Sequence, residues 1–304
     1  MQLDGLHHIT MITGDARRNV EFYAGVLGLR LVKKTVNFDA PQAYHLYFGD
    51  EHGSPGSILT WFEFAGIGPG RAGAGMIHTI ELGVPQEPSL DFWQDRLSEH
   101  GYASERTPGG GLRFSDYDGL TFELVVSEQG NAPLQAVHSE VPSSHAITGL
   151  EGARALSSRP DRHAELLTET LGFSASDAPG RFVLRGPTRS FRWSYEPGDM
   201  LGKQGAGTIH HIAWHSADAD HEQWRQRIAA VGMQVTPVMD RSYFQSIYFR
   251  EPQGVLFELA TTSPGFAVDE DPKRLGADLR LPAQHEHLRE TLERTLTPLP
   301  NLRR

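Results

Sequence analysis

The strongest constraint on the fold is an order of secondary-structure patterns that recurs along the chain. In its first copy, a strand-like run at 6–12 is followed by an apolar pattern at helical spacing that ends at Gly28. Further runs rich in β-branched and aromatic residues follow, separated by turns that contain Gly and Pro. These runs are 29–37, 43–49 and 57–64. The first module is therefore predicted to be βαβββ.

The same order returns in three further modules. Their predicted helices end at Gly101, Gly172 and Gly232 in turn, and each is preceded and followed by strand-like runs. Self-similarity at a period of roughly 55 residues indicates a repeat architecture. We therefore predict an α+β fold in which four βαβββ modules form two tandem domains.

The domain limits follow from breaks in this pattern. The stretch 128–144 contains two Pro and no clear periodicity, which is typical of a linker. We predict an N-terminal domain of two modules at 1–140 and a C-terminal domain of two modules at 141–268. The charged segment 269–304 lies outside the repeats and is predicted to be a helical tail.

Composition excludes several classes of function. The net charge of −10 over 304 residues, without a dense basic window, argues against nucleic acid and anionic membranes as partners. The absence of cysteine excludes disulfides, thiolate catalysis and cysteine-ligated zinc. No run resembles a signal peptide or a membrane span, so we expect a cytoplasmic protein. Edge strands and the tail leave room for self-association, and we expect a homo-oligomer.

Three ionisable side chains stand among apolar residues in predicted strands. They are His8 in Leu-His-His8-Ile-Thr, His211 in His-His211-Ile-Ala-Trp, and Glu258 in Leu-Phe-Glu258-Leu. Successive side chains of a strand point to opposite faces, so when the apolar neighbours face the helices these three face the other side. Two His and one carboxylate are the ligands of a 2-His-1-carboxylate metal site. A buried, unpaired carboxylate would otherwise cost several kcal/mol.

The same alternation sorts the neighbouring residues. It places Thr10 on the face of the His8 side chain and Tyr248 on the face of the Glu258 side chain. It places His7 and His210 on the opposite face, unless the strands twist or bulge there.

The repeats provide an internal control. Aligned with module four, module two has Thr79 and Glu123 at the positions of the His and Glu ligands. Aligned with module one, module three has Gly152 or Ala153 at the position of the His ligand. We therefore expect one metal site, between modules one and four. Structural roles are expected for the remaining candidates, His78, His145 and Glu123.

With a His on the first strand and a Glu on the last, the βαβββ repeats resemble the vicinal oxygen chelate superfamily. The two His motifs, together with the run Arg241-Ser-Tyr-Phe-Gln-Ser-Ile-Tyr248 that leads to Glu258, resemble the hydroquinone-type ring-cleaving dioxygenases more closely. That subgroup includes the dichlorohydroquinone dioxygenases and the MhqO-like proteins. The resemblance covers almost the whole chain.

The resemblance implies a particular metal site. It implies Fe(II), or less often Mn(II), held by His8, His211 and Glu258. In catechol extradiol enzymes the ligands all come from the C-terminal pair of modules, so a His from module one separates the two subgroups. By position, the residues that match those around the metal in this subgroup are Tyr248, Arg241, His210 and Thr10.

The implied reaction is the opening of a hydroquinone-type aromatic diol with O2. Three protein ligands on one face of an octahedral ion leave adjacent positions for a phenolate and dioxygen. The expected partners are therefore a small aromatic substrate and O2. Candidates for an aromatic pocket are Trp61, Phe62, Phe64, Phe244 and Trp214.

Two other readings remain open. A glyoxalase-like isomerase or lyase would use the same fold with a non-redox metal and a fourth ligand. The candidate is Glu63 in Trp-Phe-Glu63-Phe, which is expected at a position analogous to that of Glu258. A metal-free member could bind and sequester an aromatic drug as a resistance protein. The intact ligand set argues against the latter, because a binding protein gains nothing from a costly buried carboxylate.

Overall fold

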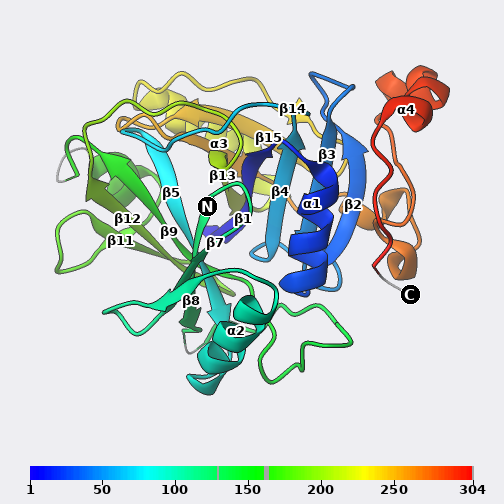
Figure 1. Ribbon diagram of the computed structural model, residues 1–304. Coiled ribbons are helices and arrows are strands. Elements are labelled where there is room, and N and C mark those ends of the chain that lie inside the picture. Colours follow the sequence, from blue (N-terminus) through cyan, green and yellow to red (C-terminus); the bar gives the residue numbers. More distant parts are fainter. Residues whose placement is uncertain (129, 161–163, 303–304) are drawn as a thin grey trace.

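The computed structural model describes residues 1–128, 130–160 and 164–302. Two eight-stranded sheets dominate it, with helices packed against them (Figure 1). Strands and helices follow one another along the chain in the predicted order, and the α+β fold of repeated βαβββ modules is confirmed.

The first sheet joins modules one and four. Its strand order is β14-β15-β16-β13-β1-β4-β3-β2. These strands are β1 (Leu3–Thr13), β2 (Arg30–Val36), β3 (Tyr44–Gly49), β4 (Ile58–Glu63), β13 (Thr208–Ser216), β14 (Met239–Asp240), β15 (Gln245–Arg250) and β16 (Leu256–Ala260). At the centre β1 runs antiparallel to β13, so segments from both ends of the repeats lie side by side.

The second sheet joins modules two and three in the same way. Its strand order is β10-β11-β12-β9-β5-β8-β7-β6. These strands are β5 (Met76–Val84), β6 (Ser104–Arg106), β7 (Leu112–Ser115), β8 (Thr121–Val126), β9 (Leu150–Ser157), β10 (Ser174–Ala175), β11 (Arg181–Arg185) and β12 (Ser190–Pro197). The proposed limit at 140 falls between β8 and β9, and each sheet contains strands from both sides of it. The division into 1–140 and 141–268 stays a prediction.

One helical segment follows the first strand of each module. These segments are α1 (Ala16–Val20) continued by the π-helical η1 (Glu21–Val26), α2 (Pro88–Glu99), the π-helical η2 (Leu166–Thr170), and α3 (His221–Ala230) preceded by the 3-10 turn η3 (Asp218–Asp220). All four predicted stop residues have positive φ, at 69°, 81°, 83° and 86° for Gly28, Gly101, Gly172 and Gly232. Within the described residues, no helix combines the length and apolar character that a membrane span requires.

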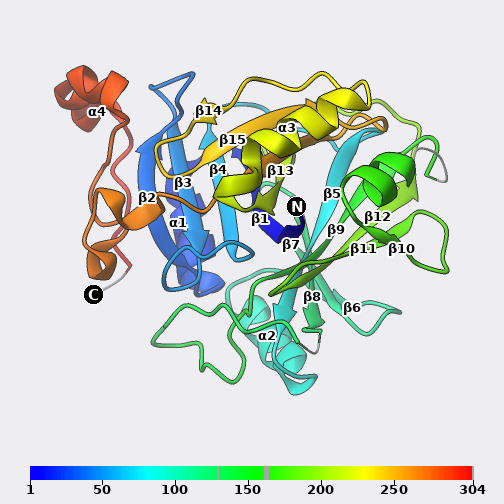
Figure 2. The same ribbon diagram turned by 180° about the vertical axis from the view of Figure 1, so that it is seen from behind.

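The C-terminal tail packs against the β2 edge of the first sheet, where α4 lies at the margin of the molecule in both views (Figures 1 and 2). Leu279 pairs with Lys34 of β2, and the buried Lys33 Nζ lies 2.6 Å from Asp269 Oδ1. His285 Nε2 lies 2.8 Å from the carbonyl oxygen of Phe38, in the β2–β3 loop. The helical pieces of the tail are η5 (Pro272–Arg274), η6 (Ala283–Leu288) and α4 (Arg289–Thr295), and η4 (Phe266–Val268) immediately precedes it.

Candidate metal centre

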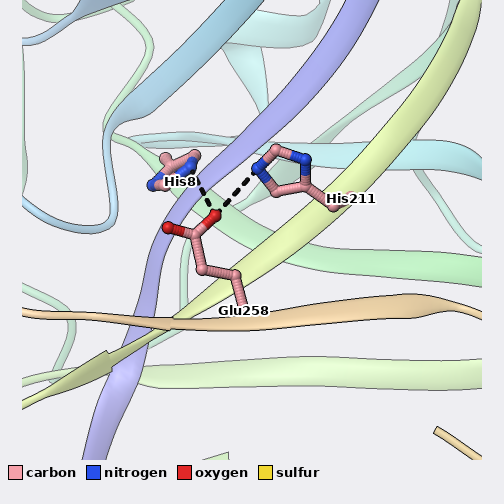
Figure 3. Close-up of side chains that lie close together, drawn as sticks. All are labelled: His8, His211 and Glu258. Carbon is pink, nitrogen blue, oxygen red and sulfur yellow. Dashed lines mark ion pairs between the residues drawn. The ribbon is translucent and has the colours of Figure 1, made fainter. Parts of the chain in front are cut away.

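Three adjacent strands of the first sheet, β16, β13 and β1, bring together His8, His211 and Glu258. The Oε2 atom of Glu258 lies 2.8 Å from His211 Nε2 and 3.3 Å from His8 Nε2 (Figure 3). All three side chains are buried. Residues separated by 203 positions in sequence, His8 and His211, therefore converge because β1 and β13 pair at the centre of the sheet.

The donor atoms fit a metal ion. One ligand atom from each residue lies within 4.8 Å of the other two. Adjacent ligands at about 2.1 Å from an octahedral ion are roughly 3 Å apart, and both contacts of Glu258 are close to this separation. Apart from facing each other, neither His211 Nε2 nor Glu258 Oε2 has a hydrogen-bond partner among the described residues. The three donor atoms are therefore suitable for a 2-His-1-carboxylate site.

The protonation states also suit a cation. Burial opposes ionisation of Glu258, but the Coulomb interaction with His8 and the hydrogen bond from His211 outweigh it and hold the pKa of Glu258 well below its usual value. Burial lowers the pKa of His211, so its imidazole is neutral. A buried anion beside a neutral imidazole is a favourable environment for a divalent ion.

A second histidine supports each histidine of the group. His7 Nδ1 lies 2.8 Å from His8 Nδ1, and His210 Nδ1 lies 2.7 Å from His211 Nδ1. Burial lowers the pKa of His7 well below its usual value and that of His210 to about 3, so both are neutral and can accept a hydrogen bond. If Nε2 of each ligand faces the metal, its Nδ1–H donates to the neighbouring ring, which fixes the tautomer and the ring orientation.

Strict alternation places His7 and His210 on the far face, with a bulge as the exception. The structure has this exception at His210, and a second bulge makes the expectation wrong for His7. The β1–β13 register shifts between Leu6 and His8, and again where Thr10 pairs with His211 but Met11 pairs with Ile209. Each shift leaves one extra residue, His7 or His210, without a cross-strand partner. Such β-bulges re-aim a side chain, and here they bring each extra His beside its neighbour.

Ser246, Tyr248 and Arg241 contact the group from module four. Ser246 donates to Glu258 Oε1, the carboxylate oxygen that does not face the histidines. Tyr248 pairs with Glu258 in the β15–β16 register, and its Oη accepts from Arg241 Nε at 3.1 Å. Arg241 Nη1 also lies 3.7 Å from Asp39 in the β2–β3 loop. The predicted positions of Tyr248 and Arg241 thus both lie beside the candidate centre.

A pocket of about 360 Å³ opens beside His8 and His211. Thr10, His210, Arg241 and Tyr248 line it with His8 and His211. Its aromatic lining consists of Phe38, Tyr47, Phe62, Phe64 and Phe244 as well as Tyr248. The other two aromatic candidates, Trp61 and Trp214, are instead buried in the core, at 1% and 0% exposure.

The repeat equivalent of Glu258 in module one is Thr60, not Glu63. Ala213 pairs with Glu258 on the parallel strand β16, and Thr10 pairs with Thr60 on β4. Glu63 lies at the end of β4, where its Oε1 accepts from the backbone N–H of Ala16 at 3.3 Å. The expectation that Glu63 is analogous to Glu258 is therefore wrong, and Glu63 does not line the pocket.

The equivalent position in the second sheet holds an ion-pair network. Glu81 pairs with both Glu123 and Gly152, which identifies Gly152 as the counterpart of His8. Arg154 donates to Glu123 Oε2, and Thr107 donates to its Oε1 at 2.8 Å. An arginine therefore neutralises this carboxylate. The other His candidates also have ordinary partners: His78 Nε2 lies 3.1 Å from Glu196, and His145 Nδ1 lies 3.2 Å from Ser89 Oγ.

Sequence reasoning missed three residues of this region. Ser246 lies two residues before Tyr248 on β15, so the two side chains point to the same face of the sheet. Alternation along this strand could therefore have identified Ser246. Thr60 contacts Thr10 across the β1–β4 pair, and His45 contacts Thr60 across the β3–β4 pair. Nothing in their local sequence predicts these contacts.

The fold and the site define the class. Residues 5–124 and 153–259 match the family described as Glyoxalase/Bleomycin resistance protein/Dioxygenase superfamily, and the chain belongs to this family. The resemblance expected from the His and Glu motifs is therefore confirmed.

Among its relatives is a Bacillus subtilis protein named "Putative ring-cleaving dioxygenase MhqO", 42% identical over 97% of this chain and 96% of that protein. The chlorohydroquinone/hydroquinone 1,2-dioxygenase of Sphingobium indicum is 31% identical over 97% of this chain and 96% of that enzyme. A crystal structure described as a "putative dioxygenase" from Bacillus subtilis superposes with a TM-score of 0.91 at 40% identity, covering 98% of each chain.

Proposed function

We propose that this protein is an Fe(II)-dependent dioxygenase that opens the ring of a hydroquinone-type diol with O2. The observation that carries the proposal is the group of His8, His211 and Glu258 at the base of an aromatic pocket. The relatives named as hydroquinone and ring-cleaving dioxygenases support the substrate class. The same donor set accepts Mn(II), which is the alternative metal.

When bound, Fe(II) would supply adjacent open positions for a phenolate and dioxygen and a route for electrons between them. The residues of the chain would hold these reactants in a reactive orientation. The aromatic lining excludes water and offers faces for stacking the diol ring.

Hydrogen-bond donors line the pocket in which the oxygen atoms of the reactants would lie. Arg241 donates to Tyr248 Oη, which leaves the Tyr248 hydroxyl hydrogen to donate in turn to a negative oxygen in the pocket. His210 accepts from His211 at Nδ1, so its remaining hydrogen stands on Nε2 and makes it a donor. Burial raises the pKa of Tyr248, which keeps its hydroxyl protonated.

The isomerase reading has less support. It needs a fourth ligand, and Glu63 faces the N-terminus of α1 instead of the pocket. Within the described residues, the candidate metal group contains three side chains. Three ligands leave the open positions that the dioxygenase reaction requires.

The test is oxygen uptake after anaerobic reconstitution with Fe(II). Hydroquinone, methylhydroquinone and catechol serve as parallel substrates, and ultraviolet spectra follow the ring-opened product. We expect uptake with the two hydroquinones and its loss in His8→Ala. If no diphenol supports uptake while the protein binds one metal per chain, the dioxygenase assignment is wrong.

A further inference from the structure

Four buried side chains form a hydrogen-bonded chain that ends at Thr10. Tyr47 Oη lies 3.0 Å from His45 Nδ1, and His45 Nε2 lies 2.9 Å from Thr60 Oγ1. Thr60 donates to Thr10 Oγ1 at 3.1 Å. The exposed fractions are 1% for Tyr47, 7% for His45 and 0% for both threonines. The chain crosses β3, β4 and β1, which are neighbours in the first sheet.

Hydrogen-bonding capacity fixes the direction of this chain. Burial lowers the pKa of His45 well below its usual value, so the ring is neutral and carries one N–H. Because Thr60 gives its own hydrogen to Thr10, its oxygen accepts from His45, and the ring hydrogen stands on Nε2. Nδ1 is then free to accept the hydroxyl hydrogen of Tyr47. Every hydrogen therefore points along the chain toward Thr10.

Thr10 has a hydrogen left to donate. The Thr10 hydroxyl oxygen accepts a hydrogen bond from Thr60. Among the residues that the structure describes, the Thr10 hydroxyl donates its own hydrogen to no other group. Thr10 lines the pocket, two residues after His8 and opposite His211 in the β1–β13 register. Its hydroxyl hydrogen is thus placed to meet an anionic oxygen bound beside these histidines.

The chain orients a donor and does not conduct protons. Its far end, Tyr47, is buried, and burial raises the pKa of Tyr47 well above its usual value. Tyr47 also lines the pocket, and its raised pKa keeps the hydroxyl protonated, which makes it a poor source of protons for the series. Hydrogen bonds in a buried series polarise one another, which strengthens the last donor.

We propose that Thr60, His45 and Tyr47 are positioning residues that hold Thr10 as a hydrogen-bond donor to the phenolate oxygen of the bound aromatic substrate. The identity of the ligand rests on the proposed function.

The test is a titration of 4-nitrophenol, whose ionisation is visible in its absorption spectrum, into Fe(II)-loaded protein under argon. Thr10→Val should weaken binding of the phenolate roughly tenfold, because a hydrogen bond to a charged oxygen is lost. It should also move ionisation of the bound phenol to higher pH. Thr60→Val should change both in the same direction, and Thr60→Ser should restore them.

The coupling between the threonines is decisive. If Thr60 acts through Thr10, the Thr10→Val/Thr60→Val protein binds no more weakly than Thr10→Val alone. The proposal would be overturned if the losses in phenolate binding of the two single variants add in the double variant. It would also be overturned if the Thr60→Val protein binds and ionises the phenol like the wild type. Thr35→Val is the matched control, since Thr35 is equally buried on β2 of the same sheet but does not line the pocket.

Should Thr60→Val not fold, Tyr47→Phe removes the donor at the far end of the chain. We expect a smaller loss of phenolate binding in the same direction, and unchanged binding would overturn the proposal. No oxygen is present in this titration. A wild-type protein that binds the phenol but fails to cleave diols would therefore refute the proposed function. The binding measurements would still test the role of Thr10 and its partners.

Discussion

Replacing Lys33 by Met tests how the tail is held on the first sheet. The side chain of Lys33 is 0% exposed, and its Nζ lies 2.6 Å from Asp269 Oδ1 and contacts Glu270. The Glu270 side chain is 1% exposed, whereas that of Asp269 is 34% exposed. The substitution therefore leaves a buried carboxylate without its nearest cation.

The cost can be worked from these contacts. Removing one partner of a buried pair costs about 3–5 kcal/mol, and an exposed pair costs about 1 kcal/mol or less. Arg280 Nε lies 3.7 Å from Glu270 Oε1 and would remain as a second cation. We therefore expect the lower limit, a loss of about 3 kcal/mol in the free energy of unfolding.

Urea unfolding at neutral pH measures this loss. Lys203→Met, at an exposed position in the β12–β13 connection, is the control and should change little. Adding Glu270→Gln to Lys33→Met should restore much of the stability, because it removes the stranded charge. A loss below about 1 kcal/mol in Lys33→Met would show that the pair is screened by water and refute the reasoning.

Two further substitutions test the centre and the interior. Ser246→Ala removes the donor to Glu258 Oε1, and a chelator competition should show metal binding weakened roughly tenfold; unchanged affinity would contradict a supporting role. Burial raises the pKa of Glu251 to about 7, so the folded state favours its protonated form and loses stability as pH rises from about 4.5 through 7. Glu251→Gln removes the titrating group and should remove this slope in urea unfolding, whatever the loss of an acceptor for the backbone N–H groups of Gln253 or Val255 does to the absolute stability; equal pH profiles would contradict it.

The three candidate ligands could be predicted because two regularities agree at each of them. Alternation along a strand assigns a face, and the repeat assigns an equivalent position in another module. Neither regularity requires knowledge of which strands pair. His8 and His211 satisfy both, and the loss of His at Thr79 and Gly152 marks the second sheet as different.

The remaining features depend on pairing, which the sequence does not record. A bulge adds one residue to one strand, and this leaves no mark on the local pattern, so alternation misplaced His7 and His210. The register of β4 against β1, and not the apolar pattern around Glu63, selects Thr60 as the counterpart of Glu258. The contact between His45 and Thr60 likewise arises only once β3 and β4 are paired.

The proposed function requires a single metal centre built from modules one and four. The most direct measurement is the metal content of the reconstituted protein by elemental analysis, with Glu123→Gln as the control from the second sheet. We predict one Fe(II) per chain in the wild type and in Glu123→Gln, and none in His8→Ala or Glu258→Gln. Full metal content in His8→Ala, or its loss in Glu123→Gln alone, would contradict the account.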